Sequence, residues 1–144
     1  MKYYIEVLKK YATFTGRSRR SEYWYFVLFN FLFSLAAGLM DNVIGTDFTF
    51  ETAYGPQSLF YGSIYIVYAL AVFIPSLAVL VRRLHDVGKS GWFILISFIP
   101  FIGAIWLLVL LFTDSQVGPN KWGPNPKGIG NPDDVDNIGN HLVQ

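Results

Sequence analysis

The chain has 144 residues, of which 53% are hydrophobic, 18% aromatic and only 15% charged, and its mean hydropathy is +0.38. A soluble domain carries about 25% charged residues, and so high an apolar content excludes intrinsic disorder over most of the chain. The absence of cysteine excludes a disulfide scaffold and a zinc–thiolate site. The length predicts one domain, with no separate catalytic domain beside it.

An amphipathic pattern opens the chain at about residues 2–13. Tyr4, Leu8 and Tyr11 follow helical spacing, while lysines occupy the other side. Two interpretations fit this pattern. It predicts a short helix on the membrane surface with its lysines toward anionic headgroups, or a solvated helix that packs on the rest of the protein.

Three stretches without any charge follow, at about residues 23–40, 59–81 and 92–112. As helices they would be about 27, 34 and 31 Å long, against a hydrocarbon core of about 30 Å. They are apolar all round, and a chain this short cannot build a core that hides all three. Aromatic residues such as Trp24 and Trp92 stand at their ends, as is typical of membrane interfaces. The sequence therefore predicts an all-α integral membrane protein with three transmembrane helices.

The third of these stretches contains two helix-breaking residues near its middle, Pro100 and Gly103. Transmembrane helices tolerate such residues when neighbouring groups satisfy the backbone. We expect a kinked helix that crosses fully. The alternative is a re-entrant hairpin, which would return the C-terminal tail to the side from which the segment started.

The sign of the charge alternates between the segments that flank these stretches. The net charge is +4 over residues 1–22, −3 over residues 41–58, +2 over residues 82–91 and −2 over residues 113–144. Basic flanks remain on the cytoplasmic side of a membrane. Three crossings would thus leave the N-terminus and the second loop in the cytoplasm, and the first loop and the tail outside.

The two basic segments also contain carboxylates close to the predicted membrane boundary. An unpaired charge at that position is costly, and the planar fork of an arginine can bridge two carboxylates. We therefore expect Glu22 and Asp86 to pair with neighbouring arginines in one polar cluster on the cytoplasmic face, which is also a candidate site for lipid headgroups. Its candidate residues are Arg17, Arg19, Arg20, Glu22, Arg82, Arg83, His85 and Asp86.

No catalytic, cofactor-binding or metal-binding signature accompanies this cluster. His85 and Asp86 are adjacent, so their side chains are not expected to share one site, and the only other histidine is His141 in the tail. Phosphate-binding loops, dinucleotide fingerprints and nucleophile elbows are absent from the sequence. The basic residues flank membrane segments instead of forming a continuous face, which does not favour nucleic-acid binding.

Four motifs lie in order between and after the apolar stretches. They read GRSRRSEYW at residues 16–24, RRLHDVGKSGW at residues 82–92, IPFIG at residues 99–103 and NKWGPNPK at residues 120–127. In this combination the chain resembles the DUF805 family of small bacterial inner-membrane proteins. The resemblance implies a multi-pass protein of the bacterial inner (plasma) membrane. It does not point to any particular biochemical activity. It predicts one membrane domain over residues 1–127. Residues 128–144 extend past the usual end of the family, and their content of Gly, Asn and Asp predicts a flexible acidic tail.

Several functions remain open at this point. The arginines and the lack of a catalytic signature favour a non-enzymatic binding or scaffold protein that contacts the bilayer, anionic headgroups, a second copy or another membrane protein. A small oligomeric transporter or channel is the alternative, although Tyr61, Tyr65 and Tyr68 share one helix face in a way more typical of packing. An enzyme that acts on a phosphate-bearing lipid through His85 and Asp86 has the least support.

Overall fold

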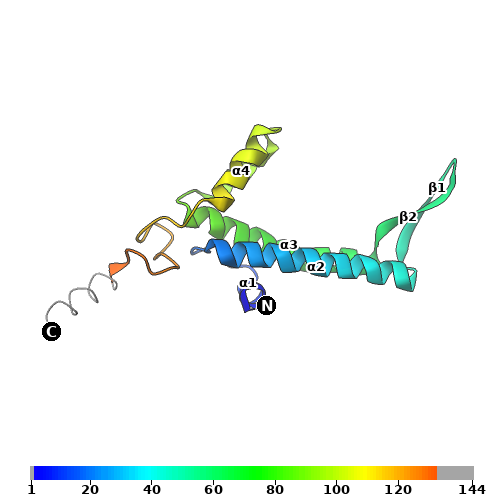
Figure 1. Cartoon of the computed structure of the whole chain (residues 1–144), viewed down its shortest axis with the longest axis horizontal. Coiled ribbons are helices and arrows are strands. Elements are labelled where there is room, and N and C mark those ends of the chain that lie inside the picture. The colour runs from blue at the N-terminus through cyan, green and yellow to red at the C-terminus, as the bar shows by residue number, and fades with distance from the viewer. Residues whose placement is uncertain (1, 133–144) are drawn as a thin grey trace.

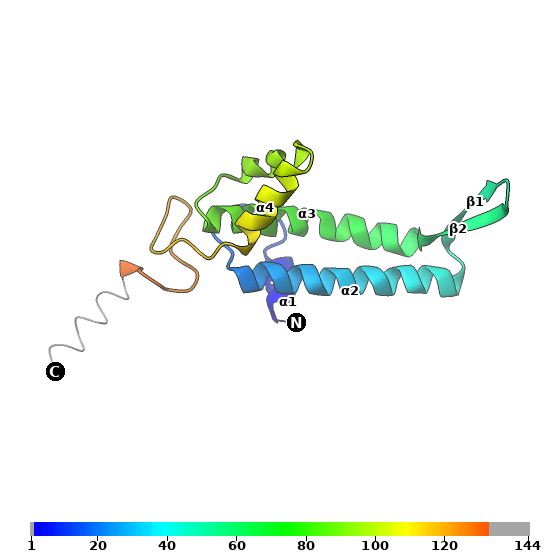
Figure 2. The same ribbon diagram turned by 45° about the horizontal axis from the view of Figure 1, so that its top comes forward.

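The computed structural model describes residues 2–132 of the chain. Helices α2 and α3 lie side by side, with a β-hairpin beyond one end of the pair and the remaining elements gathered near the other (Figure 1, Figure 2). We call the end of the α2–α3 pair that bears the β-hairpin the hairpin end, and the opposite end, where the other elements gather, the arginine end. The elements in chain order are α1 (Lys2–Lys9), α2 (Arg20–Ile44), β1 (Asp47–Thr52), β2 (Gly55–Gly62), α3 (Ser63–Asp86), the 3-10 helix η1 (Gly91–Phe98) and α4 (Ile102–Phe112).

Helices α2 and α3 are the two long apolar helices of the structure. With 25 and 24 residues they are long and apolar enough to cross a membrane, at roughly 36 to 38 Å each. Only 17% and 22% of their most apolar windows are buried, so most of their apolar surface faces outward. The second of them starts at Ser63 and not near residue 59, because residues 59–62 belong to strand β2.

The hairpin of β1 and β2 corrects the all-α prediction. Its strands pair antiparallel, with Thr49 opposite Ser58 and Thr52 opposite Gly55. At the turn, the Thr52 hydroxyl donates to the Gly55 carbonyl at 2.7 Å, and Gly55 adopts a φ of 100° that favours glycine. Residues 48–51 alternate between apolar and polar types, which is a strand signal, although the sequence analysis predicts a loop over residues 41–58.

A second correction concerns residues 92–112, which do not form one kinked helix. Helix η1 and α4 are two short arms that pack against each other and are joined by a turn at Pro100 and Phe101, where Phe101 has a φ of 62°. Each arm is about 16 Å long, half the thickness of the hydrocarbon core. The structure therefore does not confirm a third full crossing, and two short arms joined by a turn replace the expected kinked helix. Proline supplies no N–H to continue a helix, while the Gly103 N–H donates to the Ile99 carbonyl across the turn at 3.0 Å.

This reversal returns the chain to the arginine end. Residues 113–132 lie there, beside the loop that joins α1 to α2 (Figure 1). Residues 113–132 and the loop before α2 therefore lie at the same end of the α2–α3 pair. Of the predicted tail at 128–144, residues 133–144 lie outside the described residues, whereas the Ile129 carbonyl accepts from the Gly118 N–H at 3.0 Å.

Helix α1 is a packed element and is shorter than predicted, ending at Lys9 and not near residue 13. Its buried residues Tyr4 and Val7 contact Phe26 of α2 and Val79 of α3. The Tyr4 ring stacks on the Phe26 ring, with centroids 5.3 Å apart. Burial of this apolar face holds α1 across the α2–α3 pair near the arginine end (Figure 2).

Tyr68 connects three helices through its hydroxyl, which donates to Asn30 Oδ1 at 2.7 Å and lies 3.1 Å from the Tyr4 hydroxyl. Tyr68→Phe leaves both partners without this bond, so we expect the free energy of unfolding to fall by about 1–2 kcal/mol. Thermal unfolding in detergent measures the change. Tyr61→Phe is the matched control, because the Tyr61 hydroxyl makes no hydrogen bond within residues 2–132. An equal effect of the two variants would contradict the prediction.

At the hairpin end, a buried carboxylate fixes the junction between β2 and α3. Asp41, which lies inside α2, is fully buried. Its oxygens accept hydrogen bonds from the Ile64 and Tyr65 N–H groups, at 2.9 and 2.8 Å. The first N–H groups of a helix have no partner within it, and a carboxylate satisfies them well.

Candidate functional site

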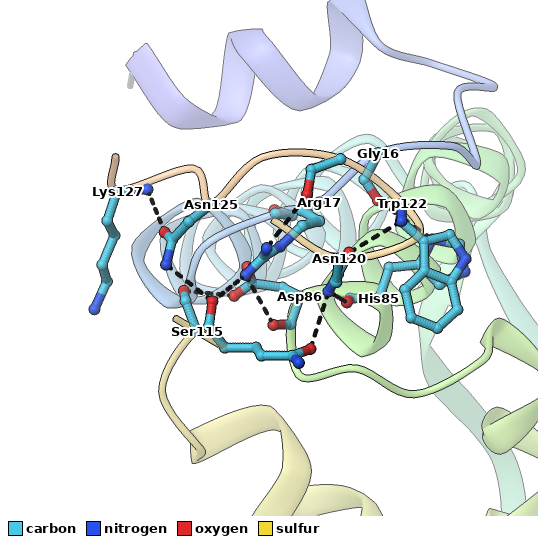
Figure 3. Close-up of polar contacts among 12 residues, drawn as sticks. Gly16, Arg17, His85, Asp86, Ser115, Asn120, Trp122, Asn125 and Lys127 are labelled. Atoms are coloured by element: carbon cyan, nitrogen blue, oxygen red, sulfur yellow. Dashed lines mark hydrogen bonds and ion pairs between the residues drawn. The ribbon is translucent and has the colours of Figure 1, made fainter. Parts of the chain in front are cut away.

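A buried carboxylate lies at the centre of the arginine end (Figure 3). Asp86, the last residue of α3, has no exposed surface. Its Oδ1 accepts from Arg17 Nε at 3.1 Å, and its Oδ2 accepts from Arg83 Nη1 and, at 2.6 Å, from the Ser115 hydroxyl. Asp86 thus joins three separate parts of the chain: the loop before α2, the end of α3 and the segment after α4, where its carbonyl also accepts from the Gln116 N–H.

Arg17 extends this network to the segment after α4. It is 8% exposed, and its guanidinium donates to the carbonyls of Gln116 and Gly118 at 2.6 and 2.7 Å, and to that of Asp86 at 3.3 Å. Five N–H donors in a rigid plane allow arginine to bind several acceptors at once. The loop before α2 is thereby held to the end of α3 and to residues 116–118.

Arg83 performs a similar task for helix α4. This arginine is fully buried and donates to the carbonyl of Leu111 at 3.3 Å, and to that of Thr113. Carbonyls at the last turn of a helix lack partners within it and carry partial negative charge. A guanidinium supplies both N–H donors and a positive charge, so Arg83 stabilises the C-terminal end of α4.

Arg82 binds the end of helix α1. Its Nη1 donates to the carbonyls of Lys10 and Thr13 at 3.2 and 2.7 Å. Its Nη2 lies 3.7 Å from Oε1 of the buried Glu22, which is also 3.7 Å from the Lys10 ammonium. Each of the three buried arginines therefore binds main-chain oxygens at or just beyond the C-terminal end of a different helix.

His85 has partners of its own, distinct from those of Asp86. Its ring stacks on Trp122, with centroids 4.4 Å and planes 10° apart, and its Nδ1 lies 3.2 Å from the Gly16 carbonyl. The His85 carbonyl accepts from Asn120 Nδ2 at 2.9 Å. Two adjacent side chains thus contact different groups, and the geometry holds residues 120–122 against the end of α3.

The segment at residues 120–127 is the part of the site that the sequence interpretation missed. Asn125 is only 3% exposed, and its Nδ2 donates to the Gln116 carbonyl at 2.9 Å (Figure 3). The turn-forming residues of this motif indicated a loop, but the expected third crossing placed that loop on the opposite side. The only available signal was the content of Asn and Gly, which suits hydrogen-bonded turns.

Arg19 and Arg20 do not contact Asp86. Arg19 donates to the Tyr3 hydroxyl, and its guanidinium lies 4.9 Å from the Tyr3 ring centroid. Arg20 is exposed, donates to the Phe112 carbonyl at 3.2 Å and lies 3.5 Å from the carboxylate of Asp114. The predicted cluster is thus divided between a buried network and two arginines at its edge.

Asp114 also accepts a hydrogen bond from the ammonium of Lys127. This bond, with a smaller contribution from the main chain of Ser115, lowers the pKa of Asp114 below its usual value. The carboxylate is therefore charged at neutral pH, and it lies between two cations.

No group of three or more metal-ligating side chains occurs within residues 2–132.

Sequence comparisons agree with the resemblance carried by the four motifs. A family model described as "Protein of unknown function (DUF805)" matches residues 11–124. Inner membrane protein YhaH of Escherichia coli (strain K12) is 41% identical over 129 residues, which cover 88% of this chain and 98% of that protein. Inner membrane protein YhaI of the same strain is 37% identical over 127 residues, covering 88% and 97%. No solved structure matches the chain. The predicted resemblance is confirmed: the chain belongs to the DUF805 family, and its relatives are inner membrane proteins.

Proposed function

We propose that this protein is a non-enzymatic binding protein of the bacterial inner membrane, which crosses the bilayer with α2 and α3 and presents its arginine end to the cytoplasm. The charge distribution supports this orientation. All 11 lysines and arginines fall within residues 2–20 and 82–127, the segments of the arginine end, whereas residues 41–62 contain three acidic residues and no base. Positive charge on cytoplasmic flanks is the strongest sequence determinant of orientation.

The observation that carries the proposal is the way in which the buried arginines are used. Arg17, Arg82 and Arg83 bind carbonyls and carboxylates of this chain, which makes them part of the framework. The cations left at the surface of that framework are available to a partner. We call these the rim cations: Lys10, Arg20, Lys121 and Lys127.

Orientation is tested by reporter fusions at two positions. A fluorescent protein fused after residue 132 is expected to be fluorescent, because it remains in the cytoplasm, and alkaline phosphatase inserted at the turn between β1 and β2 is expected to be active outside it. Exchanging the two reporters is the control, and each should then be inactive. Phosphatase activity from the fusion after residue 132 would contradict the proposed orientation.

Binding is tested by purification from native membranes in mild detergent. We expect neutralisation of the four rim cations to reduce the anionic lipid or partner protein that accompanies the wild-type chain. The matched control neutralises charge at the other end, with Asp47→Asn and Glu51→Gln. Unchanged composition in the rim variant, or an equal loss in the control, would contradict a binding function at the arginine end.

A transporter or channel is the alternative, and it has less support. The polar groups along α2 and α3 that would line a path include Asn30 and Tyr68, which bind each other at 2.7 Å. Their bond holds helices together, as expected of packing groups. Ion or solute flux in proteoliposomes that Tyr68→Phe abolishes would favour the alternative.

A further inference from the structure

An open groove runs along the outside of α2, starting at the arginine end. Its volume is about 540 Å³. Polar groups lie at one end of it and apolar side chains along the rest. It is lined by Arg20, Ser21, Trp24, Tyr25, Leu28, Phe112 and Lys127.

The polar end of the groove combines two cations with one carboxylate. The side chains of Arg20 and Lys127 are 46% and 27% exposed, and both contact Asp114, which is 56% exposed. The three groups together carry one net positive charge. An arginine has five N–H donors and a lysine three, so these contacts leave donors on both cations for a further acceptor.

The apolar part is built from aromatic and aliphatic side chains. Trp24 stacks on Phe112 with ring centroids 4.3 Å apart, and its Nε1 donates to the Leu111 carbonyl at 3.4 Å, which fixes the ring. Leu28 is 49% exposed and lies two turns beyond Arg20, about 12 Å further along α2. The groove therefore extends from the depth of a headgroup to the depth of an acyl chain, with Trp and Tyr between them, where these residues favour the interface.

We propose that this groove binds one anionic phospholipid, with its phosphate between Arg20 and Lys127 and one acyl chain along Trp24, Leu28 and Phe112. This inference deepens the proposed binding function by naming its ligand. The single net positive charge matches one phosphodiester. A free phosphate would leave the apolar floor uncovered, and a second copy of this chain would bring the same cations against each other. Asp114 competes with the phosphate for the two cations.

Because Asp114 competes with the phosphate, loss of its charge and loss of either cation should change the lipid affinity in opposite directions. The detergent-purified chain is titrated with phosphatidylglycerol or phosphatidylcholine, and bound lipid is counted by native mass spectrometry. We expect Arg20→Gln and Lys127→Gln each to weaken phosphatidylglycerol binding about fivefold, as for loss of one basic residue near an anionic headgroup. Asp114→Asn should tighten it several-fold, and phosphatidylcholine binding should change little. Lys9→Gln, which neutralises an exposed lysine of α1 that belongs neither to the groove nor to the rim cations, is the control.

Several results would overturn the proposal. Equal affinity for the two lipids is one, and weaker binding in Asp114→Asn is another, since it would mean that the three charges only bind one another. Leu28→Trp, which fills the apolar part, should also weaken binding; if it does not, or if glycerol phosphate competes as well as the lipid, the acyl chain has no place in the groove. If the rim variant loses its co-purified partner but the groove shows no lipid selectivity, this inference alone is refuted. If the rim variant keeps everything that co-purifies with the wild type, the proposed binding function is contradicted as well.

Discussion

Asp86→Asn is expected to lower the free energy of unfolding by about 3–5 kcal/mol, because it removes the only carboxylate that contacts Arg17 and Arg83 among residues 2–132. Both guanidiniums are buried, with side chains that are 1% and 0% exposed, so neither can turn to water. The amide also places an N–H group where one of the two carboxylate oxygens accepted a bond. Domains are stable by about 5–15 kcal/mol, so much of that margin should disappear.

Thermal unfolding and monodispersity in detergent measure this effect. Asp114→Asn is the matched control, because that carboxylate also contacts two cations but is 56% exposed. Exposed ion pairs contribute about 0–1 kcal/mol, so the control should unfold close to the wild type. If Asp86→Asn unfolds at the same temperature as the control, Asp86 does not hold the network together.

Gly103→Val is expected to separate η1 from α4 and to destabilise the chain by about 1–3 kcal/mol or more. A Cβ added at Gly103 would lie only 1.7 Å from the main-chain oxygen of Ile96, and backbone atoms cannot yield as a flexible side chain can. Separation of the arms would also displace the end of α4, where Arg83 binds the Leu111 carbonyl. The damage should therefore reach the arginine end.

The neighbouring residue provides the control for this variant. Ala104 is exposed, so Ala104→Val adds similar volume on the outer side of the same helix and should be tolerated. Thermal unfolding and limited proteolysis after residue 112 report on the two variants. Equal stability and equal protection from protease would mean that the close packing at Gly103 is not required.

Much of the membrane architecture follows from local sequence. Helices α2 and α3 were predicted because long uncharged stretches are a property of the chain itself. The β-hairpin was not predicted even though residues 48–51 alternate between apolar and polar types, because the acidic charge of residues 41–58 favoured a loop. That error was one of interpretation, since the strand signal was present.

The third apolar segment is a different case. Pro100 and Gly103 permit either a kink or a reversal, and in both arrangements the backbone N–H and C=O groups can be hydrogen-bonded. What distinguishes them is a set of contacts with residues distant in sequence, such as Arg83 with the end of α4 and Arg17 with Gly118. Local preferences carry no information about such partners.

The amino-acid sequence alone indicates that this chain belongs in a membrane, that its basic residues lie in segments which alternate with acidic ones, and that Glu22 and Asp86 require cationic partners. These conclusions depend on the cost of placing charge in hydrocarbon, which each residue carries wherever it lies. Only the tertiary structure decided which arginine binds which carbonyl and at which end of the α2–α3 pair residues 113–132 lie. A guanidinium can satisfy many acceptors equally well, and its choice depends on where the folded chain brings unpaired helix ends.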